Sequence, residues 1–256
     1  MTEQIEKKPI EKIAEVAQEA AHAETVPARV RGYRALLFEV ALMVVVVAFG
    51  VLTFLVKTTP FFAIDLQITR GLQSIHFPLF GQLMTLISWP GFSPQSMIIT
   101  VLIVLVLYGF GLHWEALMAL IASVLSAGVN VFVKDLIQRP RPSAPLVNVI
   151  ETLTSYSFPS GHVMFYTIFF GFIWFLAFTL LKPSLKRSLL LAFFGSLVLL
   201  VGASRIYRGE HWASDVLGAY LLASLTLVVM IQIYRWGKTR FFVHQPVAAT
   251  KPQEAS

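Results

Sequence analysis

Long blocks of apolar residues, separated by short polar connections, dominate the chain from about residue 35 onward. Six of these blocks have close to the ~20 residues that a helix needs to cross the hydrocarbon core of a bilayer. They lie at about 35–56, 95–112, 115–137, 162–181, 186–204 and 212–235. The pattern predicts an all-α, polytopic membrane protein with six transmembrane helices.

One stretch, 57–94, departs from this pattern, because polar residues and prolines interrupt its apolar residues. We expect an interfacial helix here, between the first two spans, followed by a proline-broken approach to the second span. That span begins either near residue 95 or already near Leu79. A further crossing at 75–92 is disfavoured, because the Trp-Pro-Gly run at 89–91 would break a helix at membrane depth.

The composition agrees with a membrane protein. Hydrophobic residues make up 56% of the chain and charged residues only 13%, about half the charged share of a soluble domain, and the mean hydropathy is +0.72. The absence of cysteine excludes a disulfide framework, thiolate catalysis and thiolate zinc sites. The net charge of +6 is expected from Lys and Arg in cytoplasmic loops, so no nucleic-acid partner is predicted.

The basic residues also predict an orientation in the membrane. Thirteen of the 20 Lys and Arg fall on the side that holds both termini, and seven fall on the other side. By the positive-inside rule, both termini are expected in the cytoplasm, with the plasma (inner) membrane as the location. The predicted organisation is a cytoplasmic polar tail at 1–34, a six-helix membrane domain at 35–236 and a cytoplasmic C-terminal tail at 237–256.

Three short blocks concentrate charged residues, which are costly at membrane depth and tend to mark function. The blocks are Lys134 to Pro142, then Pro159-Ser160-Gly161-His162, then Ser204-Arg205 followed by His211 and Asp215. The first block stands at the end of the third span and the second at the start of the fourth. The third block runs from the end of the fifth span to the start of the sixth. Alternating crossings therefore bring all three blocks to one face, which is the extracytoplasmic face in the predicted orientation.

The charges expected at this face suit an anion. Lys134, Arg141 and Arg205 are cations, and guanidinium forks bind phosphate oxygens bidentately. Ser160 and Gly161 lie where the fourth span begins, and the free backbone N–H groups of a helix start bind anions. We expect these five residues to surround a phosphate group.

Two histidines and an aspartate supply the reactive groups. His211 and Asp215 stand four residues apart at a helix start, so Asp215 can accept a hydrogen bond from His211 Nδ1 and leave Nε2 free to attack phosphorus. His162 remains as the candidate general acid for the leaving group. The chain has no His-Glu-x-x-His motif and no third ligand near the two histidines, so neither a metal site nor a cofactor is expected.

At every signature position, these blocks match the three-part motif of the type-2 phosphatidic acid phosphatase superfamily: Lys-x6-Arg-Pro, Pro-Ser-Gly-His and Ser-Arg-x5-His-x3-Asp. The chain resembles this family by motif over 134–215 and by its spans over about 35–236. The resemblance implies a phosphohistidine on His211, an orienting role for Asp215, a leaving-group role for His162 and no metal requirement. It also implies phosphate binding by Lys134, Arg141, Ser160, Gly161 and Arg205.

The main hypothesis is a phosphatase that acts on a lipid, because an anion site at headgroup depth admits a lipid whose tails stay in the bilayer. Candidate substrates are undecaprenyl diphosphate, phosphatidylglycerophosphate and phosphatidic acid. One alternative is a non-catalytic scaffold or anion-binding protein, against which the intact His162, His211 and Asp215 argue. Another is a haloperoxidase-like enzyme, because the signature also resembles that of the soluble vanadium-dependent haloperoxidases.

Arg139 and Arg208 stay open as substrate contacts, and the sequence predicts no oligomeric state.

Overall fold

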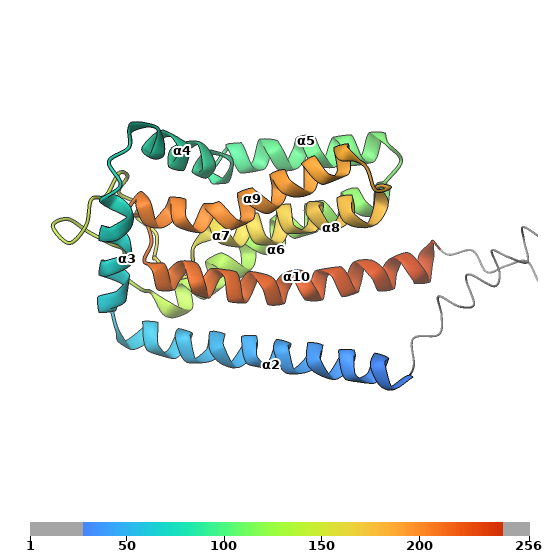
Figure 1. Cartoon of the computed structure of the whole chain (residues 1–256), viewed down its shortest axis with the longest axis horizontal. Helices are drawn as coiled ribbons and strands as arrows, with labels where there is room; N and C mark the ends of the chain where they lie inside the picture. The colour runs from blue at the N-terminus through green and yellow to red at the C-terminus, as the bar shows by residue number, and fades with distance from the viewer. Residues whose placement is uncertain (1–27, 243–256) are drawn as a thin grey trace, which may run out of the picture. The chain divides into compact units, whose positions relative to one another are not determined.

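The computed structural model describes residues 28–242, and every regular element in that range is helical (Figure 1). Five helices are each long and apolar enough to cross a bilayer, and a bent pair would make a sixth crossing if it forms one span. The prediction of an all-α membrane protein is therefore confirmed. Residues 1–27 and 243–256, which hold most of the two predicted tails, lie outside the described residues.

The first apolar block forms helix α2 (Ala28–Thr58), which begins several residues before the predicted span. The chain divides into two compact units, the first ending at Val45 and the second holding all the residues after it. Within the second unit, the last turns of α2 carry Val56 and Phe49 into a cluster with Phe158. The Phe49 and Phe158 rings stack with their centroids 6.2 Å apart.

The stretch between the first two predicted spans contains two short helices and a sharp bend. The elements are α3 (Ala63–Gln73), α4 (Pro78–Ser88), the 3₁₀ turn η1 (Trp89–Gly91) and α5 (Gln95–Gly109). Helix α3 occupies the place predicted for an interfacial helix, and it contacts α9 and α10 at one end of the second unit (Figure 1). Helix α4 is too short to cross by itself. It bends by 61° into α5, so a span made of the pair begins at Leu79, the earlier of the two predicted starts.

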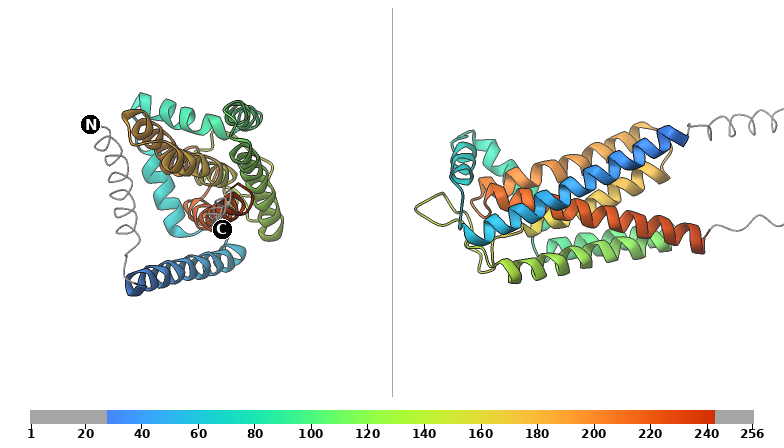
Figure 2. Two further views of the ribbon diagram at one scale, coloured as in Figure 1. Left: turned by 90° about the vertical axis from the view of Figure 1, so that its right-hand side faces the viewer. Right: turned by 90° about the horizontal axis from the view of Figure 1, so that it is seen from below.

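The remaining helices surround a buried central span. They are α6 (His113–Ile137), α7 (Gly161–Phe165), the π-helical turn η2 (Tyr166–Phe170), α8 (Gly171–Leu180), α9 (Leu185–Tyr207) and α10 (Ala213–Phe241). The continuous α7–η2–α8 span has the largest buried share of all the candidate spans, 56%, and it contacts α6, α9 and α10 (Figure 2). As the alternation of spans predicted, the ends of α6 and α9 and the starts of α7 and α10 meet at one end of this unit.

The helix ends near the three motif blocks follow from local chemistry. Helix α6 ends where Gln138 adopts a left-handed conformation (φ 57°) and donates its N–H to the Lys134 carbonyl. Pro140, two residues on, cannot continue a helix. At the start of α10, the Asp215 carboxylate accepts a 2.9 Å hydrogen bond from the backbone N–H of Trp212. This bond satisfies one of the donors that a helix N-terminus leaves free.

Candidate active site

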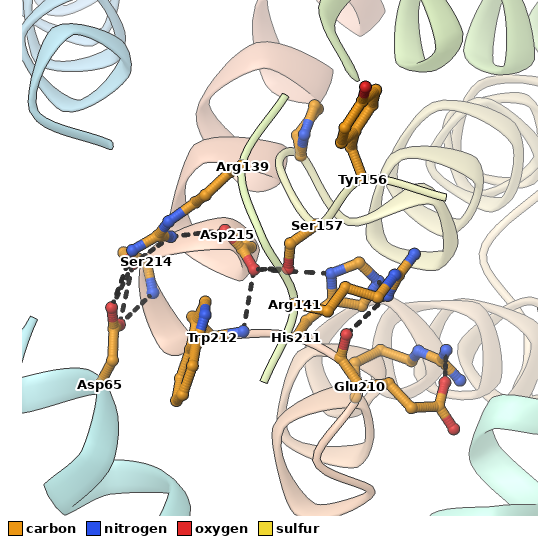
Figure 3. A network of polar contacts seen from close by, with 12 residues as sticks. Asp65, Arg139, Arg141, Tyr156, Ser157, Glu210, His211, Trp212, Ser214 and Asp215 are labelled. Atoms are coloured by element: carbon orange, nitrogen blue, oxygen red, sulfur yellow. Dashed lines mark hydrogen bonds and ion pairs between the residues drawn. The ribbon is translucent and has the colours of Figure 1, made fainter. Parts of the chain in front are cut away.

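Direct contacts join the three motif blocks that lie far apart in sequence. The Ser160 N–H donates to the Asp215 carbonyl at 3.4 Å, and Arg141 Nη1 lies 3.3 Å from His211 Nε2. Ser157, just before the second block, donates its hydroxyl to the Asp215 carboxylate (Figure 3). The structure therefore brings the predicted residues together at the end of the bundle where α6 and α9 finish.

His211 lies in the short connection between α9 and α10, and only 2% of its surface is exposed. Burial lowers the pKa of its imidazole well below the usual histidine range, and the charges of Arg141, Lys134 and Arg205 lower it further. The ring is therefore neutral at pH 7, which is the form that can act as a nucleophile. Its Nδ1 lies 3.6 Å from Asp215 Oδ2, which is longer than a hydrogen bond.

Asp215 is fully buried, and three other groups hold its carboxylate in place (Figure 3). Arg139 Nη1 contacts Oδ1 at 2.5 Å, while the Ser157 hydroxyl and the Trp212 N–H donate to Oδ2. The oxygen that faces His211 is thus fixed by donors from two different segments. A fixed carboxylate can hold the imidazole in one orientation, which is the role that the resemblance implies for Asp215.

The structure resolves the role that the sequence left open for Arg139. The side chain is 1% exposed and lies between two fully buried carboxylates, with Nη2 3.1 Å from Asp65 and Nη1 2.5 Å from Asp215. It also donates to Ser214 and to the Pro60 carbonyl. Breaking a buried ion pair by removing one partner typically costs about 3–5 kcal/mol. Arg139 therefore ties α3 to α10 and backs Asp215, and its donors are committed to protein groups.

Two of the predicted phosphate-binding cations hold the loop between α6 and α7. Arg141 donates to the Ser155 carbonyl at 2.6 Å and hydroxyl at 2.9 Å, and to the Glu210 carbonyl at 2.6 Å. Lys134 Nζ donates to the Tyr156 carbonyl. Burial lowers the pKa of Arg141 from its usual value, and the Asp215 charge opposes this shift. The loop is thus folded over the cations, which brings Arg141 beside His211.

The third cation, Arg205, belongs to a second buried charge cluster. Its guanidinium forms an ion pair with Glu210 and donates to Ser88 at 3.1 Å. Glu210 also accepts from Arg208 Nε at 2.6 Å, and Arg208 lies 3.5 Å from Glu151. Burial lowers the pKa of Arg208, whereas the Glu151 charge raises it. Arg208, the other arginine that the sequence left open, is therefore neutralised by two carboxylates.

The start of α7 presents polar atoms that have no protein partner. Ser160 Oγ and His162 Nε2 are buried, and neither makes a hydrogen bond with any residue in 28–242. Asn130 of α6 holds this turn by donating to the Pro159 carbonyl at 3.0 Å. A Cβ at Gly161 would lie only 3.1 Å from Asn130 Oδ1, so glycine suits this close packing. Buried polar groups normally find a partner, so these two atoms are available to a ligand.

Sequence reasoning missed several residues that contact the predicted ones. They are Asp65, Gly91, Phe92, Ser157 and Glu210. Asp65 and Glu210 offered a signal, because Asp65 interrupts the apolar residues of the predicted interfacial helix and Glu210 lies inside the third motif block. Ser157, Gly91 and Phe92 offered none, because their contacts join residues that are far apart in sequence.

An open cavity of about 310 Å³ lies beside Arg141. It is lined by Arg141, Gly209 and Glu210 and by the loop from Pro142 to Leu153. Gly209 has φ +66°, and a Cβ there would collide with the Asn148 carbonyl, so the loop packs directly on its backbone. Within residues 28–242, no group of three His, Asp or Glu side chains could hold a metal ion.

A neutral histidine held among basic side chains, at one end of a helical membrane protein, suits the binding and attack of a phosphate group. The model of the PAP2 superfamily matches residues 112–238. The chain is also 31% identical to phosphatidylglycerophosphatase B of Bacillus subtilis over 179 residues, which is 69% of this chain and 86% of that protein. The chain belongs to the PAP2 superfamily and is a hydrolase, so the resemblance drawn from the motifs is confirmed.

Further similarities agree with this assignment. The chain is 35% identical to human sphingosine-1-phosphate phosphatase 2 over 116 residues, which is 41% of this chain but only 27% of that protein. The crystal structure of a transmembrane PAP2-type phosphatidylglycerolphosphate phosphatase from Bacillus subtilis matches with a TM-score of 0.68 at 26% identity, over 78% of this chain and 98% of that one. Aquifex aeolicus LpxE shares the fold, with a TM-score of 0.53 at 21% identity, over 67% and 96% of the two chains.

Proposed function

We propose that this protein is a metal-independent lipid phosphatase in which His211 attacks phosphorus and carries the phosphoryl group. The observation that supports this most directly is the setting of His211. Its imidazole is buried and neutral, and Nε2 lies 3.3 Å from the Arg141 guanidinium. A nucleophile must be deprotonated at its attacking atom, and its anionic target must be attracted to that atom. The neutral ring of His211 can present an unprotonated Nε2, and Arg141 supplies the attraction for the anion.

In the first step, His211 Nε2 forms a bond to phosphorus while the bond from phosphorus to the leaving oxygen breaks. His162 gives its proton to that oxygen, and Asp215 stabilises the positive charge that develops on the His211 ring. The phosphoryl oxygens are bound by side chains and by backbone N–H groups at the start of α7. The residues in this binding role are Lys134, Arg141, Ser160, Gly161 and Arg205.

In the second step, water attacks the phosphohistidine. His162, which gave up a proton in the first step, accepts a proton from this water, the bond between phosphorus and His211 Nε2 breaks, and inorganic phosphate leaves. Both histidines return to their starting protonation states, so each cycle consumes one water and one ester or anhydride bond. The positive charge around the phosphoryl group is carried by side chains in this scheme, which is why we propose that no metal is needed.

We infer that the substrate is a lipid, because the site lies at the ends of membrane-spanning helices. A headgroup phosphate can reach that depth while the lipid tails remain in the bilayer. Phosphatidylglycerophosphate is the leading candidate. It is named in the relative that is 31% identical and in the solved structure that is 26% identical. Phosphatidic acid and undecaprenyl diphosphate are the other candidates, the second being a diphosphate.

Phosphate release by the purified protein tests this function directly. Vesicles containing phosphatidylglycerophosphate, phosphatidic acid or undecaprenyl diphosphate are compared, each with and without excess EDTA. We expect release from at least one lipid, at the same rate in EDTA. A loss of activity in EDTA that one divalent ion restores would contradict the mechanism. A folded protein that releases phosphate from none of the lipids would favour the non-catalytic scaffold instead.

We also propose that residues 35–236 form the phosphatase domain between two cytoplasmic tails, with the active site on the extracytoplasmic face. The native chain has no cysteine, so single cysteines can report the topology without background. Asn148, in the loop beside Arg141, and Ser184, between α8 and α9, are both exposed. In intact cells, Asn148→Cys is expected to react with a membrane-impermeant thiol reagent, whereas Ser184→Cys is expected to react only after the membrane is opened. The reverse pattern would overturn the orientation.

A further inference from the structure

The span built from α4 and α5 is broken beside His162. The break comprises residues 89–94, where a 3₁₀ turn and two prolines separate the two helices and the chain bends by 61°. Proline and glycine in this run cannot continue a helix, so the bend follows from the local sequence. A break at membrane depth is tolerated where the chain is buried in protein or lines a polar cavity, so its surroundings matter.

Gly91 in the break contacts the imidazole of His162 directly. A Cβ added to Gly91 would lie 2.9 Å from His162 Cγ, 2.9 Å from Tyr166 Cε2 and closer still to His162 Cδ2. Carbon atoms that are not bonded to each other prefer a separation of about 3.5–4.0 Å, so a side chain at position 91 would displace the ring. Only glycine lets the backbone approach His162 this closely.

Phe92, the next residue, contacts the same imidazole with its ring. The two ring centroids are 4.7 Å apart, and the ring planes meet at 80°. The guanidinium carbons of Arg205 and Arg208 lie 5.2 Å and 5.3 Å from the Phe92 centroid. Phe92 thus contacts both His162 and Arg205, which is one of the predicted phosphate-binding residues.

Hydrogen bonds attach this break to the neighbouring helices. The Tyr166 hydroxyl donates to the Ile87 carbonyl at 2.6 Å, which joins η2 to the end of α4. Ser88 contacts the Ser204 hydroxyl at 2.5 Å and accepts from Arg205 at 3.1 Å, which joins α4 to α9. The break therefore cannot shift without moving groups on two other helices.

We propose that the break between α4 and α5 positions His162 for proton transfer, with Gly91 and Phe92 as its positioning residues. This inference rests on the general-acid role given to His162 in the proposed function. Carbon contacts hold the imidazole from the side, while Nε2 makes no hydrogen bond to a residue in 28–242. Nε2 is therefore open to a substrate oxygen, because no protein group among the described residues competes for that nitrogen.

Gly91→Ala tests the proposal, because the added methyl group has to move the His162 ring. Proton donation matters for a lipid alkoxide, which is a poor leaving group, and hardly matters for a nitrophenolate. We expect Gly91→Ala to lower kcat/KM for the lipid phosphate at least about tenfold more than kcat/KM for nitrophenyl phosphate, as part of the ~10²–10⁴-fold contribution of a general acid. Gly128→Ala is the matched control, because a Cβ there meets no atom within 4 Å. Gly128→Ala is expected to keep the wild-type ratio of kcat/KM for the lipid phosphate to kcat/KM for nitrophenyl phosphate.

Phe92→Leu and His162→Ala complete the experiment. Phe92→Leu is expected to change the ratio in the same direction, even if Gly91→Ala does not fold. One outcome would overturn the positioning role and leave the proposed function intact. In that outcome, His162→Ala loses activity selectively on the lipid, whereas folded Phe92→Leu and any folded Gly91→Ala keep the wild-type ratio of kcat/KM for the lipid phosphate to kcat/KM for nitrophenyl phosphate. Equal loss on both substrates in His162→Ala would instead overturn the general-acid assignment, and the inference with it.

Discussion

His211→Ala is expected to abolish phosphate release from every substrate, lipid or nitrophenyl. The substitution removes the atom that bonds to phosphorus, so the choice of leaving group cannot rescue the reaction. Loss of a catalytic nucleophile typically costs about 10⁴-fold or more in kcat. The measurement is phosphate release by the purified variant, with folding checked by thermal unfolding. His76→Ala is the matched control, because His76 is exposed and outside the site.

The same variant tests whether the intermediate is a phosphohistidine. A phosphoryl group bonded to imidazole nitrogen survives alkali and is lost in acid. Wild-type protein quenched in alkali during turnover of a radiolabelled lipid phosphate is expected to carry label on the peptide that contains His211. His211→Ala should carry none. Substantial phosphate release by His211→Ala, or label on a different residue, would show that another group attacks phosphorus.

His162→Ala is expected to produce the second-largest loss, and the loss should depend on the substrate. Without the imidazole, the leaving alkoxide of a lipid phosphate departs unprotonated, and kcat/KM should fall by about 10²–10⁴-fold. A nitrophenolate is stabilised by its own ring, so kcat/KM for nitrophenyl phosphate should fall much less. The comparison uses kcat/KM, because this quantity reports the loss of transition-state stabilisation relative to free enzyme and substrate.

His162 also takes part in the second step, when water attacks the phosphohistidine, and this limits what kcat can reveal. That step is common to both substrates, so it can slow both and hide the difference between leaving groups. It follows departure of the leaving group and does not enter kcat/KM if that departure is irreversible. Equal losses of kcat/KM on the two substrates would mean that His162 binds phosphate rather than donating a proton.

Much of the fold and the candidate site was readable from the sequence because it depends on local properties. A span is recognised by its length and apolarity, which is why the blocks assigned to α6, α7–α8, α9 and α10 agree with the structure to within a few residues at most boundaries. Alternating crossings predicted that the three motif blocks share one face, and the structure places Arg141 beside His211 there. The Trp-Pro-Gly run at 89–91 was predicted to break a helix, and the chain bends there.

The tertiary structure alone decided which charged groups pair with each other. Arg139 lies two residues before Arg141, yet its fork binds Asp65 and Asp215 from α3 and α10 while Arg141 lies beside His211. The motif spacing Lys-x6-Arg-Pro selects Arg141 and left the role of Arg139 open. What distinguishes Arg139 is its contact with carboxylates about 75 residues away in sequence.

The sequence by itself therefore determined the membrane class and the family and predicted the reactive residues, because periodicity and motif spacing are local properties of the chain. The tertiary structure determined how those residues are held. Asp215 is fixed by Arg139, Arg205 is paired with Glu210, and His162 is enclosed by Gly91 and Phe92. Glu210, Gly91 and Phe92 occupy no signature position, yet each holds a signature residue through a close contact. Such contacts depend on how separate helices pack, which no local pattern records.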